Sequence, residues 1–175
     1  CSTTYAADRT ATEVFSNKAS EIRRRLLLTD EMRLIMMFED SFPSGGFIDC
    51  IDFLKPLERS SSAIDLVSLR KLRTMLDTLR KVVGFFDGVK DEVYPNLKRM
   101  SSHILAFPEV QRRIDGIIDR YGDVKDTASD ILYDIRKSLR EKEGAISRRI
   151  NAILKKAQEE GIVDSDAGVS VRDGK

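Results

Sequence analysis

The sequence is poor in the residues on which most catalytic and metal sites depend. Its 175 residues include one histidine, two cysteines and no tryptophan. A nucleophilic serine or cysteine needs a base beside it, and a zinc site needs several histidines and cysteines close together. The single histidine, His103, supplies neither arrangement, and we interpret it as a partly buried helix residue. We therefore expect this chain to catalyse nothing on its own.

Nucleotide-binding loops and membrane spans are also missing. The glycines of "SGG" (44–46) are not followed by the Lys-Ser or Lys-Thr pair of a phosphate-binding loop, so this stretch is predicted to be an ordinary loop. The longest apolar run, "RLIMMF", is far shorter than the roughly 18 residues that a membrane helix needs. We expect neither a membrane partner nor a metal site in this chain.

The cysteine content indicates an unreactive thiol, and the charged-residue content does not by itself indicate a binding partner. Cys1 and Cys50 give no disulfide framework, and the apolar neighbours of Cys50 in "FIDCIDFL" predict a buried thiol. Charged residues make up 34% of the chain, but the net charge is only +1. The overall charge therefore neither predicts nor excludes nucleic-acid binding, and the local distribution has to decide.

Helical periodicity runs through almost the whole chain, and it predicts an all-α helical bundle. The clearest helix lies within 63–88, where apolar residues recur at spacings of three and four and Gly88 provides a stop signal. Ile22, Leu26 and Met36 share a face of an earlier helix. Two segments have an extended pattern: 47–51, where the signal is weak, and 169–172. We therefore expect one short strand, at the C-terminus. The apolar residues of the clearest helix are Leu66, Leu69, Leu72, Leu76, Leu79 and Val83.

The last helix is predicted to be unusually long. Asp126 or Thr127 can cap its beginning, and Gly161 is a suitable stop. The roughly 34 residues between them would extend about 51 Å. A compact domain of this chain length has a radius of gyration near ~16 Å. We therefore expect the helix to project from its bundle.

A narrow apolar seam runs along this long helix, as in a coiled coil. Lys142 or Glu143 interrupts the seam, and Gly144 beside them is a candidate bend. Such a seam needs a partner, and we expect an antiparallel helix from a later part of the protein. The chain begins at Cys1 and ends in the strand-like "VSVRDGK", so we interpret it as part of a longer protein. The seam consists of Ala128, Leu132, Ile135, Leu139, Ile146, Ile150, Ile153 and Ala157.

The same helix carries most of the local positive charge. Between residues 136 and 156 there are eight basic and two acidic side chains, a balance of +6. One interpretation is a solvated coiled-coil face, and the other is an arm that contacts phosphates and binds less tightly as salt rises. This arm has no aromatic side chains, so it is not expected to stack on bases. The candidate nucleic-acid-binding residues are Arg140, Arg148, Arg149, Lys155 and Lys156.

One segment resembles a known family. "DRYGDVKDTASDILYDIRKSLR" (119–140) resembles the pattern Asp-x-x-Gly-x-Val-x-Asp-x-Ala-Ser-x-x-Leu-x-x-Ile-Arg of the type-two branch of the bacterial MutS family. "VSVRDGK" is similar to the family's Val-x-x-Arg-Asp-Gly-Arg/Lys segment. Asp130 departs from the family, which often has proline there. The matching residues are Asp119, Gly122, Val124, Asp126, Ala128, Ser129, Leu132, Ile135 and Arg136.

The resemblance implies a set of parts. Residues 1–120 would form a helical core and lever domain, and residues 121–175 a clamp helix with a strand-like tail. The longer parent protein would add an ATPase domain that uses ATP and Mg and a C-terminal Smr endonuclease domain. Such proteins are cytoplasmic bacterial homodimers that act on branched DNA and suppress homologous recombination, and some are associated with stalled ribosomes.

Two functions from different classes are therefore expected. The first is a DNA-binding lever and clamp segment of an ATP-dependent MutS-type protein that suppresses homologous recombination. The alternative is a helical interaction module that pairs with another chain or binds ribosomes and their rRNA. The basic arm favours the first function, and the unpartnered apolar seam is compatible with both.

Overall fold

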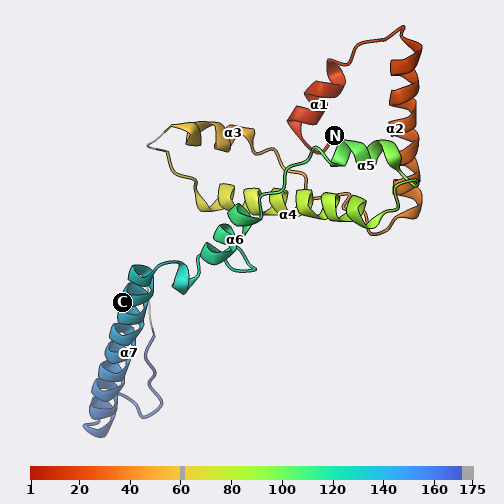
Figure 1. Cartoon of the computed structure of the whole chain (residues 1–175). Helices are drawn as coiled ribbons and strands as arrows, with labels where there is room; N and C mark the ends of the chain where they lie inside the picture. Colours follow the sequence, from red (N-terminus) through yellow and green to blue (C-terminus); the bar gives the residue numbers. More distant parts are fainter. Residues whose placement is uncertain (60–61, 171–175) are drawn as a thin grey trace. The chain divides into compact units, whose positions relative to one another are not determined.

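The computed structural model describes residues 1–59 and 62–170, and the regular structure in this part of the chain is helical, joined by irregular connections (Figure 1). It contains no β-strand, so the all-α class is confirmed. The chain divides into two units, Cys1–Asp123 and Val124–Lys175. The α-helices are α1 Thr4–Ala11, α2 Ala19–Phe38, α3 Ile51–Leu54, α4 Leu66–Gly88, α5 Pro95–Ser101, α6 Pro108–Ile117 and α7 Asp130–Glu159, and short 3₁₀ turns span Lys55–Glu58 and Asp126–Ala128.

The two segments predicted to be extended do not form strands in the described residues. Residues 47–50 are irregular, and α3 begins directly after them. Of the predicted strand 169–172, Val169 and Ser170 are irregular, while 171 and 172 lie outside the described residues. No helix in the described residues is long and apolar enough to cross a membrane.

The core of the first unit forms where α2, α4 and α5 meet (Figure 1). Phe85 and Phe86 of α4 meet Phe42 edge to face, with ring centroids 5.1 to 6.2 Å apart. Offset and edge-to-face contacts of this kind are favourable because each ring has a negative face and a positive rim. The buried members of the core are Ile35, Val82, Phe86, Tyr94 and Leu97.

A buried carboxylate of α2 joins this core to α5. Tyr94 occupies the position before α5, but its side chain does not cap the helix. Glu31 takes over that role: Oε1 accepts from the Asn96 backbone N–H at 3.1 Å and Oε2 from the Leu97 N–H at 2.8 Å. The first N–H groups of a helix have no partner within the helix, and a negative charge suits that end of its dipole. Glu31 therefore fixes the position of α5 on α2.

The "SGG" stretch is a loop, as predicted, and it docks on α4. Gly46 has φ +82°, and its carbonyl accepts a hydrogen bond from Thr78 Oγ1 at 3.1 Å. A Cβ at Gly46 would lie 2.4 Å from the same hydroxyl oxygen. The loop can approach α4 this closely because Gly46 has no side chain.

Two predictions about side-chain burial in the first unit fare differently. Cys50 is buried, and burial raises the pKa of its thiol above the ordinary value. His103, by contrast, is exposed and lies in a turn, so its assignment as a partly buried helix residue was wrong. Helix α5 ends at Ser101, and the Ile104 N–H turns back to the Ser101 carbonyl at 2.9 Å, which places His103 at the surface.

The second unit consists mainly of α7, which runs without a break through Gly144 for 30 residues. Its cap differs from the predicted one: Ser129 is the N-cap, and its hydroxyl accepts from the Leu132 N–H at 3.2 Å. Gly161 ends the helix with φ +69°, as predicted, and the chain then turns back beside α7 (Figure 1). The projection of α7 from the bundle and the division into core and clamp domains remain predictions.

Candidate nucleic-acid interface

The basic arm, defined as residues 136–156 of α7, is anchored at its beginning by a double ion pair. Asp126 lies in the 3₁₀ turn before the helix, and its two carboxylate oxygens each accept from a different arginine. Oδ1 meets Arg136 Nη1 at 2.6 Å, and Oδ2 meets Arg140 Nη1 at 2.6 Å. Arg136 Nη1 also donates to the Val124 carbonyl at 2.8 Å. Asp126 therefore ties the incoming chain to the first three turns of α7 instead of capping it.

The anchor has a measurable electrostatic signature. Hydrogen bonds from Arg140 and then Arg136 lower the pKa of the Asp126 carboxyl below its ordinary value of 3.8. A carboxyl whose pKa is lowered in the folded state stabilises that state above its unfolded pKa, and this contribution is lost as pH falls through the folded pKa. The anchor is therefore complete at neutral pH and opens only in acid.

An NMR titration checks this anchor. We expect the Asp126 carboxyl to titrate below 3.8 in the unmodified chain and to move upward in Arg140→Gln, because that change removes its largest stabilising contact. Arg148→Gln, which removes an arginine farther along the same helix, serves as the matched control and should leave the midpoint in place. Equal midpoints in the Arg140 and Arg148 variants would contradict the anchor.

The five candidate residues fall into three classes. Arg140 is held by Asp126, so its role is partly structural, and that contact raises its pKa. Lys155 and Lys156 lie 3.9 and 3.6 Å from Glu159 and Glu160, one helical turn away, and their side chains remain 78% and 75% exposed. Exposed pairs of this kind are weak. The lysines can therefore exchange these partners for a phosphate.

Arg148 and Arg149 are the most available members of the set. Both are exposed on α7, and no ion pair holds either of them within the described residues. A guanidinium provides a fork of donors that matches the geometry of a phosphate. These two residues are therefore the strongest candidates for direct phosphate contact on the arm.

Two of the candidate basic residues of α7, Arg148 and Lys155, lie opposite the apolar seam, and we call them the basic face. At about 100° per residue, the seam residues from Leu132 to Ala157 fall within about 60° of one another. By the same arithmetic, Arg148 and Lys155 lie about 170° from the middle of the seam, whereas Lys156 lies about 90° and Arg149 about 70° from it. The interruption at Glu143 does not rotate the seam, because its position lies close to the same direction. A partner helix on the seam would leave the basic face open and would lie beside Arg149 and Lys156.

The seam is uncovered in the described part of the chain. No residue of α7, all of which is described, is buried, and Ile135, Leu139, Ile146 and Ile153 are each more than half exposed. The tail after Gly161 is held at the end of the helix, where Gln158 Nε2 donates to the Ser165 and Ala167 carbonyls at 3.2 and 3.1 Å. An apolar stripe of this length is typical of a helix that pairs with another one.

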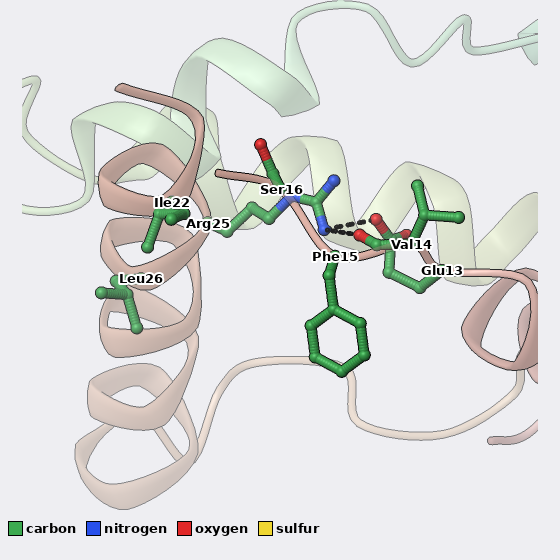
Figure 2. Close-up of a pocket in the computed structure, with 7 residues that line it drawn as sticks. All are labelled: Glu13, Val14, Phe15, Ser16, Ile22, Arg25 and Leu26. Atoms are coloured by element: carbon green, nitrogen blue, oxygen red, sulfur yellow. Dashed lines mark hydrogen bonds and ion pairs between the residues drawn. The ribbon is translucent and has the colours of Figure 1, made fainter. Parts of the chain in front are cut away.

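An apolar pocket of about 530 Å³ lies between the α1–α2 connection and the beginning of α2 (Figure 2). An ion pair of 2.5 Å between Arg25 and Glu13 joins the connection to α2. This lining suits the binding of an apolar group and offers no arrangement of catalytic side chains. The predicted apolar face of α2, with Ile22, Leu26 and Met36, is exposed, because α2 buries Glu31 and Ile35 on another face. The remaining lining residues are Val14, Phe15, Ser16, Ile22 and Leu26.

Comparison with known proteins gives a consistent result. The chain is 29% identical over 136 residues to "Endonuclease MutS2" of Clostridium botulinum (strain Alaska E43 / Type E3), covering 77% of this chain and 17% of that protein. It is 27% identical over 146 residues to the Geobacillus sp. (strain WCH70) protein of the same name, covering 82% and 18%. The Thermomicrobium roseum protein of that name matches over 180 residues at 27%, covering 100% and 22%.

The chain is related to the MutS2 endonucleases. No protein-family model matches it. The MutS2 relationship confirms the resemblance drawn from 119–140. The chain spans about a fifth of the length of these MutS2 relatives, so the activity in their name belongs to proteins several times longer. Within the MutS2-like chain, residues of the resemblance have structural roles near the start of the second unit: Asp126 and Arg136 belong to the anchor, and Ser129 caps α7.

Proposed function

We propose that the chain is a lever and clamp segment through which a MutS2-type protein contacts branched DNA. The separation of the basic face from the apolar seam on α7 carries this proposal. A helix that is covered on its seam by a partner and open on its basic face can contact a phosphate backbone while remaining rigidly held. No aromatic side chain lies on the arm, which suits contact with the backbone of a duplex and not with its bases.

The mechanical part of the proposal follows from the length of α7. A continuous helix of 30 residues transmits a displacement from one end to the other with little bending. The double ion pair at Asp126 would fix the end of the lever, so that a movement there reaches the basic face. In the longer protein, an ATPase domain with ATP and Mg would drive that movement, and a nuclease domain would lie in the same chain.

Loss of the two available arginines tests the DNA contact. Arg148→Gln together with Arg149→Gln is expected to weaken binding of the 175-residue chain to a four-way DNA junction about tenfold at 50 mM salt. The slope of log K against log salt should become shallower by about two, because each lost phosphate contact releases one counterion fewer. Binding is measured by fluorescence anisotropy across a salt series.

A matched pair of arginines on α2 provides the control. Arg23 and Arg24 are also adjacent and exposed, and replacing both by glutamine removes the same charge from the first unit. This double variant should retain its affinity within roughly twofold and keep the original salt slope. The DNA-contact proposal is wrong if the unmodified chain does not bind at low salt, or if both double variants lose affinity equally.

The uncovered seam favours a second candidate function, an interaction module that pairs with another chain or binds ribosomes. Four of its apolar side chains are more than half exposed, which is costly for a helix without a partner. Co-sedimentation with ribosomes and measurement of the chain's own oligomeric state test this function. A chain that stays monomeric and remains in the supernatant would exclude it.

The other features implied by the MutS2 relationship are proposed for the longer protein. They are homodimer formation, suppression of homologous recombination and a cytoplasmic location. The relatives are named endonucleases, which agrees with nuclease activity outside the segment that this chain covers. This segment itself would bind and transmit movement without catalysing a reaction.

A further inference from the structure

A small pocket in the first unit brings together three arginines and a tyrosine. We call it the arginine pocket; its volume is about 140 Å³. Helix α4 contributes one wall, and the turn after α6 contributes the other. None of its lining residues is acidic. The polar and backbone groups that line it are Arg70, Arg73 and Thr74 from α4, and Arg120, Tyr121 and Gly122 from the turn.

The turn that forms the second wall is tightly built. The Asp119 carboxylate accepts from the backbone N–H groups of Tyr121 at 2.8 Å and Asp123 at 2.9 Å. Gly122 has φ +87°, and a Cβ on it would lie 2.5 Å from Arg70 Nε. Only glycine therefore allows Arg70 to approach the turn and donate to the Gly122 carbonyl at 2.5 Å. The position of the pocket wall is fixed by these contacts.

Two arginines of the pocket are oriented by carboxylates outside its lining. Arg70 Nη2 meets Asp123 Oδ1 at 2.9 Å, and Arg73 Nε meets Asp115 Oδ1 at 2.6 Å. A guanidinium has five N–H donors, and these bonds, with that to Gly122, engage Nε and Nη2 of Arg70 and Nε of Arg73. The pairing reduces the local charge but holds the guanidinium groups in place. Preorganised donors of this kind suit a phosphate oxygen.

Tyr121 adds an exposed aromatic surface at the edge of the pocket. Its side chain is 71% exposed, and the Arg120 guanidinium carbon lies 4.7 Å from the ring centroid. A large exposed ring held by a cation is a stacking platform for a nucleobase, whatever the base. Arginine donors beside such a ring form the combination by which proteins bind unpaired nucleic-acid strands. The basic arm of α7 has the charge but lacks the ring.

We propose that the arginine pocket binds a backbone phosphate of an unpaired nucleic-acid strand, with the neighbouring base stacked on Tyr121. Sites that enclose a whole small molecule usually measure about 300–1,000 Å³. A pocket of 140 Å³ encloses one group only, so the rest of the ligand lies outside it. That favours a strand over a free nucleotide. In a duplex the bases are stacked on each other and unavailable to Tyr121, so an unpaired strand is preferred.

Fluorescence anisotropy with a labelled ten-nucleotide oligothymidylate tests the site in the 175-residue chain. We expect Tyr121→Ser to weaken binding about tenfold, because each base–aromatic stack contributes strongly to affinity. Tyr121→Phe keeps the ring and should stay within roughly twofold of the unmodified chain. Arg120→Gln removes the cation beside the ring and should weaken binding about fivefold at 50 mM salt.

Arg112→Gln is the matched control, because Arg112 is an exposed arginine of α6 outside the pocket lining. It should bind the oligonucleotide as the unmodified chain does. The proposal is overturned if the unmodified chain does not bind the strand at 50 mM salt, if Arg112→Gln and Arg120→Gln weaken binding equally, or if Tyr121→Phe behaves like Tyr121→Ser. Thymidine monophosphate competing as well as the strand would make the ligand a free nucleotide and would overturn the strand assignment.

This site is independent of the proposed DNA contact of α7. It uses residues of the first unit only, and its probe is an unpaired strand and not a junction. The double variant of Arg148 and Arg149 should therefore lose junction affinity and retain strand binding, whereas Tyr121→Ser should lose strand binding and retain junction affinity. Failure of either proposal leaves the other standing, because different residues and different ligands report on each.

Discussion

Replacing Glu31 by alanine is expected to lower the free energy of unfolding of the first unit by about 3 kcal/mol. Glu31 is only 8% exposed, and its carboxylate accepts from Asn96 N–H, Asn96 Nδ2 and Leu97 N–H at 3.1, 2.6 and 2.8 Å. Removal of the carboxylate leaves the first backbone N–H groups of α5 without their acceptor. Desolvated donors without a partner are costly, and hydrogen bonds to a charged acceptor are the stronger kind.

Urea denaturation followed by near-UV circular dichroism measures this loss, because the buried Tyr94 and the phenylalanine core report on the first unit. Glu31→Gln keeps one acceptor oxygen and turns an amide toward the second donor, so it should lose about half as much. Glu92 is exposed in the turn before α5, and Glu92→Ala should change stability by no more than about 0.5 kcal/mol. Equal losses in the alanine variants would refute a capping role for Glu31.

Local signals in the sequence predict the helices of this chain well. Apolar residues at spacings of three and four predict α4 over nearly its whole length, and Gly88 is its last residue. Gly161 ends α7 with positive φ, as a glycine at that position should. These features depend on residues within a few turns of one another, so a single sequence contains all the information that they need.

Long-range contacts explain most of the errors. Glu31 follows basic and apolar residues in a charged helix, and nothing nearby in the sequence indicates that α5, 65 residues later, supplies its donors. Asp126 is of a residue type that often caps helices, but its carboxylate is bound to Arg136 and Arg140, and Ser129 caps α7 instead. In both cases a tertiary contact overrides the local preference of an acidic residue.

The candidate binding residues likewise include some that the sequence can predict and some that depend on long-range contacts. The basic residues of the arm could be found from the sequence because they lie on one helix and their charge is visible there. The arginine pocket could not, because it joins α4 to a turn about 50 residues later. Arg70 and Arg73, three residues apart on one helix face, were its only local signal, and many exposed helix faces carry such a pair. The glycine and aspartate of the resemblance motif, Gly122 and Asp119, shape its second wall.

Phe86→Ala is expected to destabilise the first unit by about 4 kcal/mol, the larger of the two stability effects. Phe86 is 4% exposed and lies at the centre of the aromatic cluster, with its ring centroid 5.2 Å from Phe85 and 6.2 Å from Phe42. Truncation removes the buried ring and leaves a cavity between α2, α4 and α5, which neighbouring side chains can fill only in part. The two edge-to-face contacts are lost in addition.

Phe86→Leu separates burial from aromatic contact. Leucine refills most of the cavity but cannot make the ring contacts, so the expected loss falls to about 1.5 kcal/mol. Phe38 of α2 is 70% exposed, and Phe38→Ala should change the free energy of unfolding by no more than about 0.5 kcal/mol. All three are compared by urea denaturation.

Because the second unit has its own helix, α7 should keep its far-UV circular dichroism signal in the Phe86 variants. Loss of the structure of both units at one urea concentration would show that the two units unfold together.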